Sequence, residues 1–513
     1  MKLKNISLFY YFIIKKYISA HINNGDYMKE KSIWSEIKQK EICPKLEKDI
    51  SVNVLIIGGG ITGISTAYHL INNNLKVALV EKNEIAHGVT SRTTGKLTFL
   101  QENIYSKLKT YHGIDKTKLY LDSQIEAIEL VKNIVEENNI NCNLEKVNSY
   151  VFTYSKDDKL EKEIKLLKEF KVSIKETNNL PTNKDINKAY YAENTYVFHV
   201  IKYLYALKEI CLKNNISIYE NTKIISVDKK DNFYICKTNN NKIKAKHIVF
   251  ATHYPYFLIP FLMPLKGYIE KSYIEAYKVD KNYKYSCINI EKPTISSRYY
   301  TDDNINYKIY LTNSHNTAIK DNDNENFKGL LNSKNNVPDY IWSNKDIITN
   351  DSLPFIGSIN NDKNLLIGTG YNTWGMTNGS LAGKILADII LKKQNKYIEL
   401  FNPLRKINIG KVVNFPIILG SNIYSFTKTK INKQKSWYSN NVKFEKRNGK
   451  NIAIYIDENK KEHIVYNLCP HLKCSLMFNE VEKTWDCPCH GSRFDIDGKC
   501  IEGPSNYDIT YKE

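Results

Sequence analysis

The apolar positions near the start of the chain predict a strand, a helix and a second strand in succession. Val52–Ile57 is an apolar run of the type that lies buried on both faces of a parallel sheet. Ile64–Asn72 continues with helical spacing, and Lys76–Glu81 is a second apolar strand. This order of elements predicts the beginning of an α/β domain.

Further along, the periodicity predicts more helices and the strands of a different sheet. Ile104–Asn138 and Tyr203–Asn214 have helical spacing, and Ser380–Leu391 follows as another helix. Short strands are expected at Tyr150–Tyr154, Val172–Glu176, Ile224–Val227, Phe233–Cys236, His247–Ala251, Leu365–Gly368, Asn451–Asp457 and His463–Asn467. Residues 321–336 are rich in Asn and Asp and predict an exposed loop, and the irregular segment 407–430 predicts a linker.

The charge of the chain raises the question of a nucleic-acid partner and then argues against it. The 513 residues carry a formal net charge of +19, but nearly all of the positive charge is scattered lysine. Bidentate recognition of phosphates and bases favours arginine, which is scarce here, so no nucleic-acid partner is expected. No apolar run reaches the length of about 18 residues that a transmembrane helix needs. Residues 1–27 resemble a signal peptide only superficially, and translation from Met28 is the preferred interpretation.

A glycine-rich turn follows the first strand. Gly58-Gly59-Gly60-Ile61-Thr62-Gly63 is a G-x-G-x-x-G motif between a strand and a helix, which is the context that a dinucleotide site requires. The helix N-terminus supplies unpaired N–H groups and a partial positive charge for phosphates. Glu81 ends the next strand, where its carboxylate would accept hydrogen bonds from the adenosine ribose. A dinucleotide site is therefore predicted here.

Cysteine and histidine residues crowd into the last part of the chain. Cys469-Pro-His471 and Cys487-Pro-Cys489-His490 give C-x-H followed by C-x-x-H. Two Cys and two His would also suit structural zinc, although zinc pairs usually have Cys-x₂₋₄-Cys spacing. A Rieske [2Fe–2S] centre takes thiolates on one iron and imidazoles on the other, so it needs one Cys and one His from each of two loops. The clustering indicates a local metal site in a reducing compartment, and the predicted location is cytoplasmic.

Two further segments favour FAD over NAD as the dinucleotide. Residues 87–98 form a polar Gly/Ser/Thr stretch, and Asp351–Gly357 precedes the glycine-rich Leu365–Gly379. With these motifs, residues 52–400 resemble the FAD-dependent D-amino-acid oxidase/glycine oxidase superfamily. The resemblance implies bound FAD. It places the ADP half at Gly58, Gly60, Ile61, Thr62, Gly63 and Glu81, and the phosphate–flavin segment at Ser91, Thr94 and Lys96. It places the isoalloxazine ring near Gly370, Gly375, Met376 and Thr377. A helix beginning at Met376–Thr377 would place its positive end beside the flavin.

The C-terminal segment strongly resembles a Rieske domain, with Gly503-Pro504-Ser505 resembling the loop that covers the cluster. The resemblance implies that the ligands are Cys469, His471, Cys487 and His490, and that Cys474–Cys489 is a disulfide between the two loops. Lys473 stands where Gly is usual. Phe494 stands where high-potential members have a Tyr, so a lower potential is expected.

Together the motifs resemble bacterial FAD-dependent oxidoreductases with a C-terminal Rieske module. The resemblance implies an α/β FAD-binding Rossmann-type domain with an interleaved α+β substrate domain, plus a small all-β Rieske domain. The expected boundaries are an N-terminal extension over 1–50, the FAD-dependent oxidoreductase over 51–400, a linker over 401–430 and the Rieske domain over 431–513. The expected cofactors are FAD and a [2Fe-2S] cluster.

The activity that this resemblance implies is dehydrogenation of a C–N bond in an amine or amino acid, with electrons passing from flavin to cluster and on to a one-electron partner protein or quinone. A reductase fed by NAD(P)H or ferredoxin, and a non-enzymatic redox sensor, stay open as alternatives. No catalytic residue is identified. The candidates for a substrate pocket are Arg298, Tyr300, His253 and His315, whereas His199 is expected to begin a helix.

Overall fold

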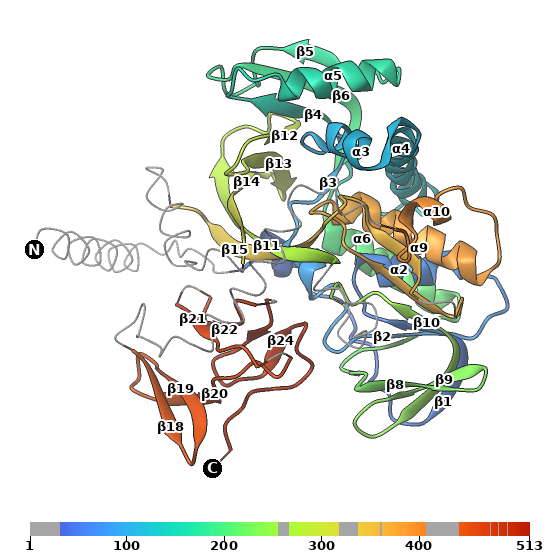
Figure 1. Cartoon of the computed structure of the whole chain (residues 1–513), viewed down its shortest axis with the longest axis vertical. Coiled ribbons are helices and arrows are strands. Elements are labelled where there is room, and N and C mark those ends of the chain that lie inside the picture. Colours follow the sequence, from blue (N-terminus) through green and yellow to red (C-terminus); the bar gives the residue numbers. More distant parts are fainter. Residues whose placement is uncertain are drawn as a thin grey trace, which may run out of the picture.

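The computed structural model describes residues 31–254, 266–317, 337–359, 362–406, 441–471, 473–480, 482–489 and 491–512. Residues 1–27, the predicted loop 321–336 and the predicted linker 407–430 lie outside the described residues. Two large sheets lie next to each other, and small sheets from the C-terminal segment lie beside the second (Figure 1). The predicted fold class is confirmed.

The first large sheet contains the predicted strand–helix–strand unit. Its path has the order β16-β17-β10-β1-β2-β7, with β8 and β9 attached to β10. Pairing along β17-β10-β1-β2-β7 is parallel, and β16 and the β8–β9 hairpin are antiparallel. The bounds are β1 (Ile50–Ile57), β2 (Val77–Val80), β7 (Ser217–Tyr219), β8 (Ser226–Lys230), β9 (Phe233–Lys237), β10 (Lys242–Phe250), β16 (Phe355–Ser358) and β17 (Leu365–Thr369). The predicted strands in this region are confirmed, with ends moved by a few residues.

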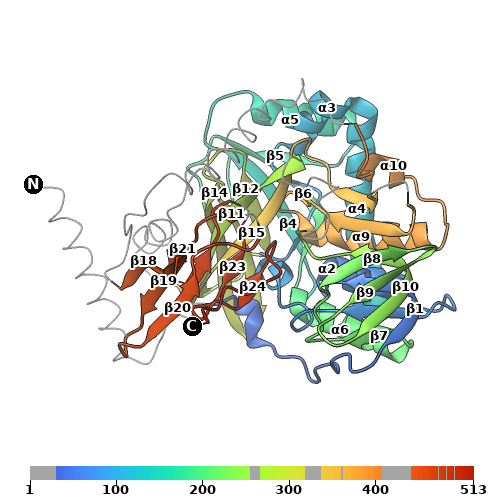
Figure 2. The ribbon, with the colours of Figure 1, turned by 60° about the horizontal axis from the view of Figure 1, so that its bottom comes forward.

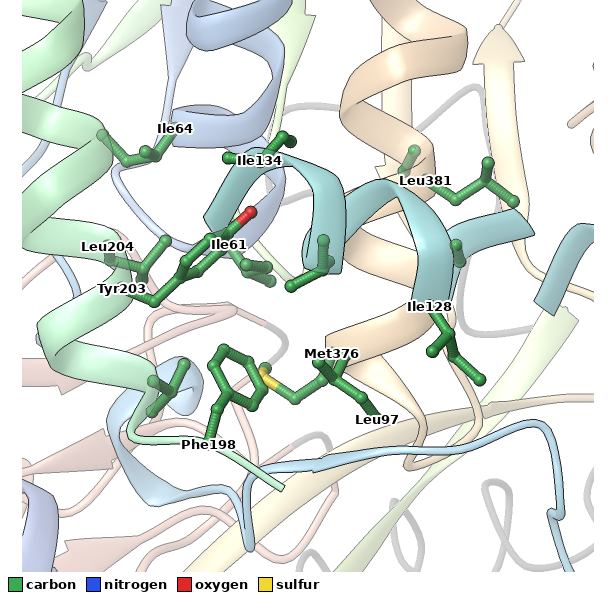
Figure 3. Packing of buried hydrophobic residues seen from close by; sticks show 14 of the residues in the cluster. Ile61, Ile64, Leu97, Ile128, Ile134, Phe198, Tyr203, Leu204, Met376 and Leu381 are labelled. Atoms are coloured by element: carbon green, nitrogen blue, oxygen red, sulfur yellow. The ribbon is translucent and has the colours of Figure 1, made fainter. Parts of the chain in front are cut away.

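The helices pack against this sheet and against one another around one core. The helices are η1 (Ile33–Glu36), α2 (Ile61–His69), η2 (Val89–Arg92), α3 (Ile104–His112), α4 (Ile114–Glu137), α5 (Lys159–Glu169), α6 (Val200–Lys213), α9 (Gly375–Ile390) and α10 (Ile398–Phe401). In Figure 3, Met376 of α9 points toward Phe198 and Leu97 in this core. Helices α2 and α9 approach closely because α9 presents Gly383, where a Cβ would lie 2.4 Å from the Cβ of Ser65. Among the described residues, no helix combines the length and apolar character that crossing a membrane would require.

One helical prediction needs a correction. The segment predicted as helical over Ile104–Asn138 is two helices, α3 and α4, which meet at Gly113. Gly113 has φ +85°, a left-handed conformation that ends one helix and that glycine adopts at little cost. The other predicted helices are present, and α9 begins at Gly375, five residues before the predicted start at Ser380.

The second large sheet has the order β15-β11-β14-β13-β12-β4-β6-β3, with β5 attached to β6. Its strands are β3 (Lys96–Leu97), β4 (Glu145–Thr153), β5 (Lys175–Thr177), β6 (Lys188–Val197), β11 (Gly267–Val279), β12 (Tyr285–Asn289), β13 (Ser296–Asp302), β14 (Ile305–Asn316) and β15 (Tyr340–Thr349). Because the chain enters this sheet at β3, leaves it for β7–β10 and returns at β11, the two large sheets are interleaved in sequence. None of the strands β11–β15 was predicted.

The C-terminal segment is all β. A three-stranded sheet consists of β18 (Val442–Arg447), β19 (Lys450–Ile456) and β20 (Glu462–Tyr466), and a four-stranded sheet of β21 (Met477–Asn479), β22 (Thr484–Asp486), β23 (Arg493–Phe494) and β24 (Cys500–Glu502). A core that includes Trp485 and Phe494 joins the two small sheets. Figure 2 shows this segment beside β11 and β15 of the second large sheet.

Candidate active site and metal centre

The turn after β1 can be built only from glycine at two positions. Gly58 has φ +111°, and a Cβ there would lie 2.5 Å from the carbonyl oxygen of Ala251. A Cβ on Gly63 would lie 1.9 Å from the carbonyl oxygen of Gly58. Glu81 closes the turn from the next strand, because its Oε2 accepts from the N–H of Gly59 at 2.8 Å. The turn therefore leaves the N-terminus of α2 close to an adjacent cleft.

This cleft encloses about 1350 Å³ of empty space, part of it open to solvent. The residues predicted for FAD that line it are Gly58, Gly60, Ile61, Thr62, Glu81, Gly375 and Met376. The glycine cradle and the helix N-terminus fit a dinucleotide such as FAD. Of the other predicted residues, Gly63, Ser91, Gly370 and Thr377 do not line the cleft; Ser91 donates to the carbonyl of Gly88 and Thr377 to that of Trp374.

A second cavity, with about 630 Å³ of empty space that is partly open to solvent, adjoins the cleft. The two share Thr93, Asn344, Asp346, Thr373 and Met376 in their linings. Thr94 and Lys96, both predicted for the flavin segment, line this second cavity. Its position next to the start of α9 makes it the candidate substrate cavity.

Lys96 lies at the buried end of this second cavity. Its Nζ donates to the carbonyl oxygen of Cys287 at 2.9 Å and to the Oγ of Ser296. Burial lowers the pKa of Lys96 to about 8. The ammonium group is therefore already held by two acceptors from the second sheet.

The structure places Arg298, a predicted pocket candidate, outside the linings of both cavities. It is 1% exposed, lines neither cavity, and its Nη1 donates to the carbonyls of Thr94, Gly95 and Phe198 at 3.0, 2.6 and 3.1 Å. Trp34 supports the same turn, since its Nε1 donates to the carbonyl of Thr93 at 2.6 Å. Arg298 therefore holds the backbone that leads into the flavin segment.

The other pocket candidates are also placed differently from the prediction. Tyr300 packs against Trp34, with ring centroids 5.0 Å apart, and His315 stacks on Tyr273. Neither lines a cavity described above. His253 lines the dinucleotide cleft, so it lies on the cofactor side. His199 caps α6 as expected, because its Nδ1 accepts from the N–H of Lys202.

The cysteine-rich loops have matching backbone geometry. The N–H of Lys473 donates to the carbonyl of Cys469 at 2.8 Å, and the N–H of Gly491 donates to that of Cys487 at 2.9 Å. Lys473 has φ +59° and Gly491 φ +74°, so both loops turn through a left-handed residue at the same place. This conformation explains why glycine would be usual at the position of Lys473.

The donor groups of these loops fit an iron–sulfur cluster better than zinc. A disulfide joins Cys474 to Cys489 and ties the loops together. The sulfur atoms of Cys474, Cys487 and Cys489 lie within 4.8 Å of one another, but two of them are consumed by the disulfide. Cys469 and Cys487 carry no disulfide and are buried. With His471, they supply the mixed thiolate and imidazole donors that a Rieske centre needs. His490 lies outside the described residues.

The cluster loops lie against the flavin cleft. The ring of Tyr254, which lines the cleft, is 6.1 Å from the ring of His471 between centroids. The cleft is also lined by Ile501, Glu502, Gly503, Ser505 and Asn506, which include two residues of the predicted proline loop. Lys82, after β2, donates to the carbonyl of Ile501 at 3.1 Å. One cleft is thus shared by the two domains.

Buried ion pairs hold the C-terminal domain on β11 and β15. Lys271 of β11 lies 3.3 Å from Asp486 and 3.5 Å from Glu482. Lys345 of β15 lies 3.6 Å from Asp486 and donates to the carbonyl of Gly491 at 3.0 Å. Although burial opposes ionisation, Arg493 and Lys271 lower the pKa of Glu482 to about 2. Sequence reasoning missed these residues because their partners lie far away along the chain.

A glycine-rich dinucleotide cleft that adjoins a thiolate–imidazole loop pair defines a flavoprotein oxidoreductase with an iron–sulfur domain. The comparisons agree with this class. The chain belongs to the family described as FAD dependent oxidoreductase (DAO), whose model matches residues 53–389. The model of the Rieske [2Fe-2S] domain matches residues 428–511. The protein is therefore an FAD-dependent oxidoreductase whose cofactors are FAD and a [2Fe-2S] cluster.

One relative matches nearly the whole chain, and solved structures match its oxidoreductase part. A protein of Bacillus subtilis named putative Rieske 2Fe-2S iron-sulfur protein YhfW is 30% identical over 501 residues, which cover 94% of this chain and 98% of that protein. Among solved structures, glycine oxidase from Geobacillus kaustophilus has a TM-score of 0.59 at 15% identity, covering 70% of this chain and 100% of its own. L-proline dehydrogenase from P. horikoshii has a TM-score of 0.57 at 17% identity, covering 71% and 98%. These two structures establish the shared fold.

Proposed function

We propose that this protein dehydrogenates a C–N bond of an amine or amino acid and passes the electrons singly to its own Rieske centre. The observation that carries the proposal is the shared cleft, which is lined on one side by the dinucleotide turn and on the other by residues 501–506 of the C-terminal domain. Two solved neighbours are named glycine oxidase and L-proline dehydrogenase, so their names give oxidation of an amino acid, which supports a related reaction here.

The chemistry supplied by the bound groups is hydride acceptance by FAD and one-electron transfer by a [2Fe–2S] cluster. The protein's own part is positioning. Gly58, Gly60 and Glu81 would hold the ADP half, and the positive end of α9 at Gly375–Thr377 would stabilise negative charge on a bound ring. Met376 lines both cavities, where the proposed cofactor side meets the proposed substrate side.

The proposed cluster ligands are Cys469, His471 and Cys487, together with His490 outside the described residues. The disulfide Cys474–Cys489 keeps the two ligand loops together. Tyr254 lines the cleft and its ring lies 6.1 Å from that of the proposed ligand His471, which supports electron transfer between the two proposed cofactor sites. The partners would be a small amine or amino acid and a one-electron protein or quinone. A cytoplasmic location stays a prediction from the cysteine distribution.

Anaerobic addition of amines and amino acids to the holoprotein tests the proposal. We expect bleaching of the flavin absorption, followed by the electron paramagnetic resonance signal of a reduced Rieske centre. In Cys487→Ser the flavin should still bleach, but this signal should be absent. Bleaching by NAD(P)H alone would favour a reductase, and no bleaching by either class would favour a redox sensor.

A further inference from the structure

The strands β11 and β15 present carboxylates to the substrate cavity in a paired arrangement. Glu270 lies directly opposite Asp346, and Ser272 lies opposite Asn344, in the antiparallel register of the two strands. All four residues line the second cavity, because alternate residues of a strand share a face. The intervening lysines point to the other face, where they contact the C-terminal domain.

Asn344 offers an acceptor that no group of the described chain uses. The residue is 7% exposed, and its Nδ2 donates to Asp346 Oδ2 at 3.0 Å. Its Oδ1 is buried without a hydrogen-bond partner. Buried polar atoms are normally satisfied, so an unsatisfied acceptor in a cavity wall indicates a ligand that donates. Asn344 lines both cavities, so this ligand would lie beside the cofactor side.

The cations near this wall already form ion pairs or hydrogen bonds, whereas Asp346 forms no ion pair with any described residue. Arg92 forms an ion pair with Glu502 at 3.3 Å, and Lys292 pairs with Glu270 at 3.1 Å. Lys96 donates to two acceptors of the second sheet. In the described part of the chain, no ion pair involves Asp346. Burial, and then the charges of Glu270 and Glu502, raise the pKa of Asp346 to about 7.

We propose that Asp346 and the Oδ1 of Asn344 bind the protonated nitrogen of a cationic amine, and that the substrate carries no carboxylate on the carbon next to that nitrogen. This inference rests on the proposed function and narrows its substrate class from amines and amino acids to amines. An ammonium group satisfies both acceptors and neutralises Asp346. A carboxylate in the same place would meet Asp346 and Glu270 as like charges, and Arg298, a guanidinium that could compensate, is held elsewhere.

A pair of isosteric ions that the enzyme cannot oxidise tests the site directly. tert-Butylammonium has N–H donors and no hydrogen on the carbon next to nitrogen, and pivalate is the anion of the same shape. Binding to the holoprotein is measured by calorimetry and by the shift of the flavin absorption. We expect tert-butylammonium to bind at least about tenfold more tightly than pivalate, since a charge-assisted hydrogen bond contributes roughly this much or more.

Three variants sharpen the test. Asp346→Asn should weaken tert-butylammonium binding about 10- to 100-fold. Asp339→Asn, at the edge of β15 and paired with Lys278 on the surface, is the matched control and should change nothing. Lys292→Met removes an exposed cation that pairs with Glu270, so it should tighten binding of tert-butylammonium. A folding defect can weaken binding but does not tighten it, so this variant tests the site even if Asp346→Asn misfolds.

The outcomes separate this inference from the proposed function. Tighter binding of pivalate, binding of neither ion, or unchanged cation binding in Asp346→Asn overturns the ammonium site. If the cation binds through Asp346 but butylamine and benzylamine do not bleach the flavin, the site stands and the proposed function fails. If norvaline and phenylglycine, their α-carboxylated counterparts, bleach the flavin faster than the amines, the proposed function stands and the substrate class is wrong.

Discussion

Replacing both Lys271 and Lys345 by methionine should release the C-terminal domain from β11 and β15. Both lysine side chains are at most 5% exposed, and their ammonium groups face Asp486, Glu482 and the carbonyl of Gly491 at 3.0–3.6 Å. A hydrogen bond to a charged group contributes about 1.5–3 kcal/mol, so the two lysines contribute about 3–6 kcal/mol. Because desolvation offsets part of this, we expect the lower half of the range, or about 10²- to 10³-fold in the docking equilibrium.

The assay follows electron transfer inside one chain. After anaerobic mixing with a reducing amine, stopped-flow absorption separates flavin bleaching from cluster reduction. The double variant should still bleach on addition of the amine, because the lysines lie on the strand face away from the cavity, whereas cluster reduction should slow and the particle should expand in small-angle X-ray scattering. Lys278→Met is the control, since Lys278 lies on the same strand, is 53% exposed and pairs with Asp339, away from the C-terminal domain.

Salt gives an independent check on the same contacts. Salt screens the interaction between exposed charges, with a Debye length of about 8 Å at physiological ionic strength. Buried ion pairs are screened much less. The wild-type rate of cluster reduction should therefore depend little on salt. If the double variant keeps the wild-type rate and dimensions, the buried lysines do not hold the domain and the reasoning about the interface is refuted.

Three further outcomes are expected. Gly63→Ala should lose bound flavin, because its Cβ would lie 1.9 Å from the carbonyl oxygen of Gly58; the ratio of flavin to protein absorption measures this, and normal flavin content would contradict the packing argument. Cys489→Ser opens the disulfide that closes a 15-residue separation, worth about 3 kcal/mol, so iron should be lost at lower temperature than in Cys500→Ser, a cysteine outside the disulfide. Burial lowers the pKa of His199 to about 3, so the folded state binds fewer protons than the unfolded state below pH 6.5 and stability falls with acidity. Between pH 8 and pH 5 the wild type should lose about 2 kcal/mol more than His199→Asn, which keeps a capping side chain; equal losses in urea unfolding would count against this assignment.

The cofactor half of the site could be predicted because its signals are local. The strand Ile50–Ile57, the turn beginning at Gly58 and the helix after it are contiguous, and each step follows from residues a few positions apart. The cluster loops are equally local, since Cys and His alternate within a few residues in each. The disulfide and the loop geometry then add what spacing alone leaves open, namely that the second cysteines are tied to each other.

The substrate half could not be predicted, because its chemistry depends on distant pairing. Scarcity made Arg298 look like a ligand, yet its partners are backbone carbonyls that only the fold brings around it. Glu270 and Asp346 each stand next to a lysine, so the local sequence is typical of an exposed, solvated strand. The charges are buried only because β11 pairs with β15 and the C-terminal domain covers one face.

The alternation of charge on β11 and β15 makes both substrate binding and the docking of the C-terminal domain depend on the pairing register of these two strands. Glu270 faces Asp346 across the strands on the cavity side, and Lys271 faces Lys345 on the side of the C-terminal domain. A slip of the pairing by one residue would exchange the faces, placing lysines at the substrate cavity and carboxylates against Asp486 and Glu482. Both the ammonium site and the docking of the C-terminal domain would then fail together. The same hydrogen-bonded strand pair therefore fixes what the cavity can bind and where the electron acceptor lies.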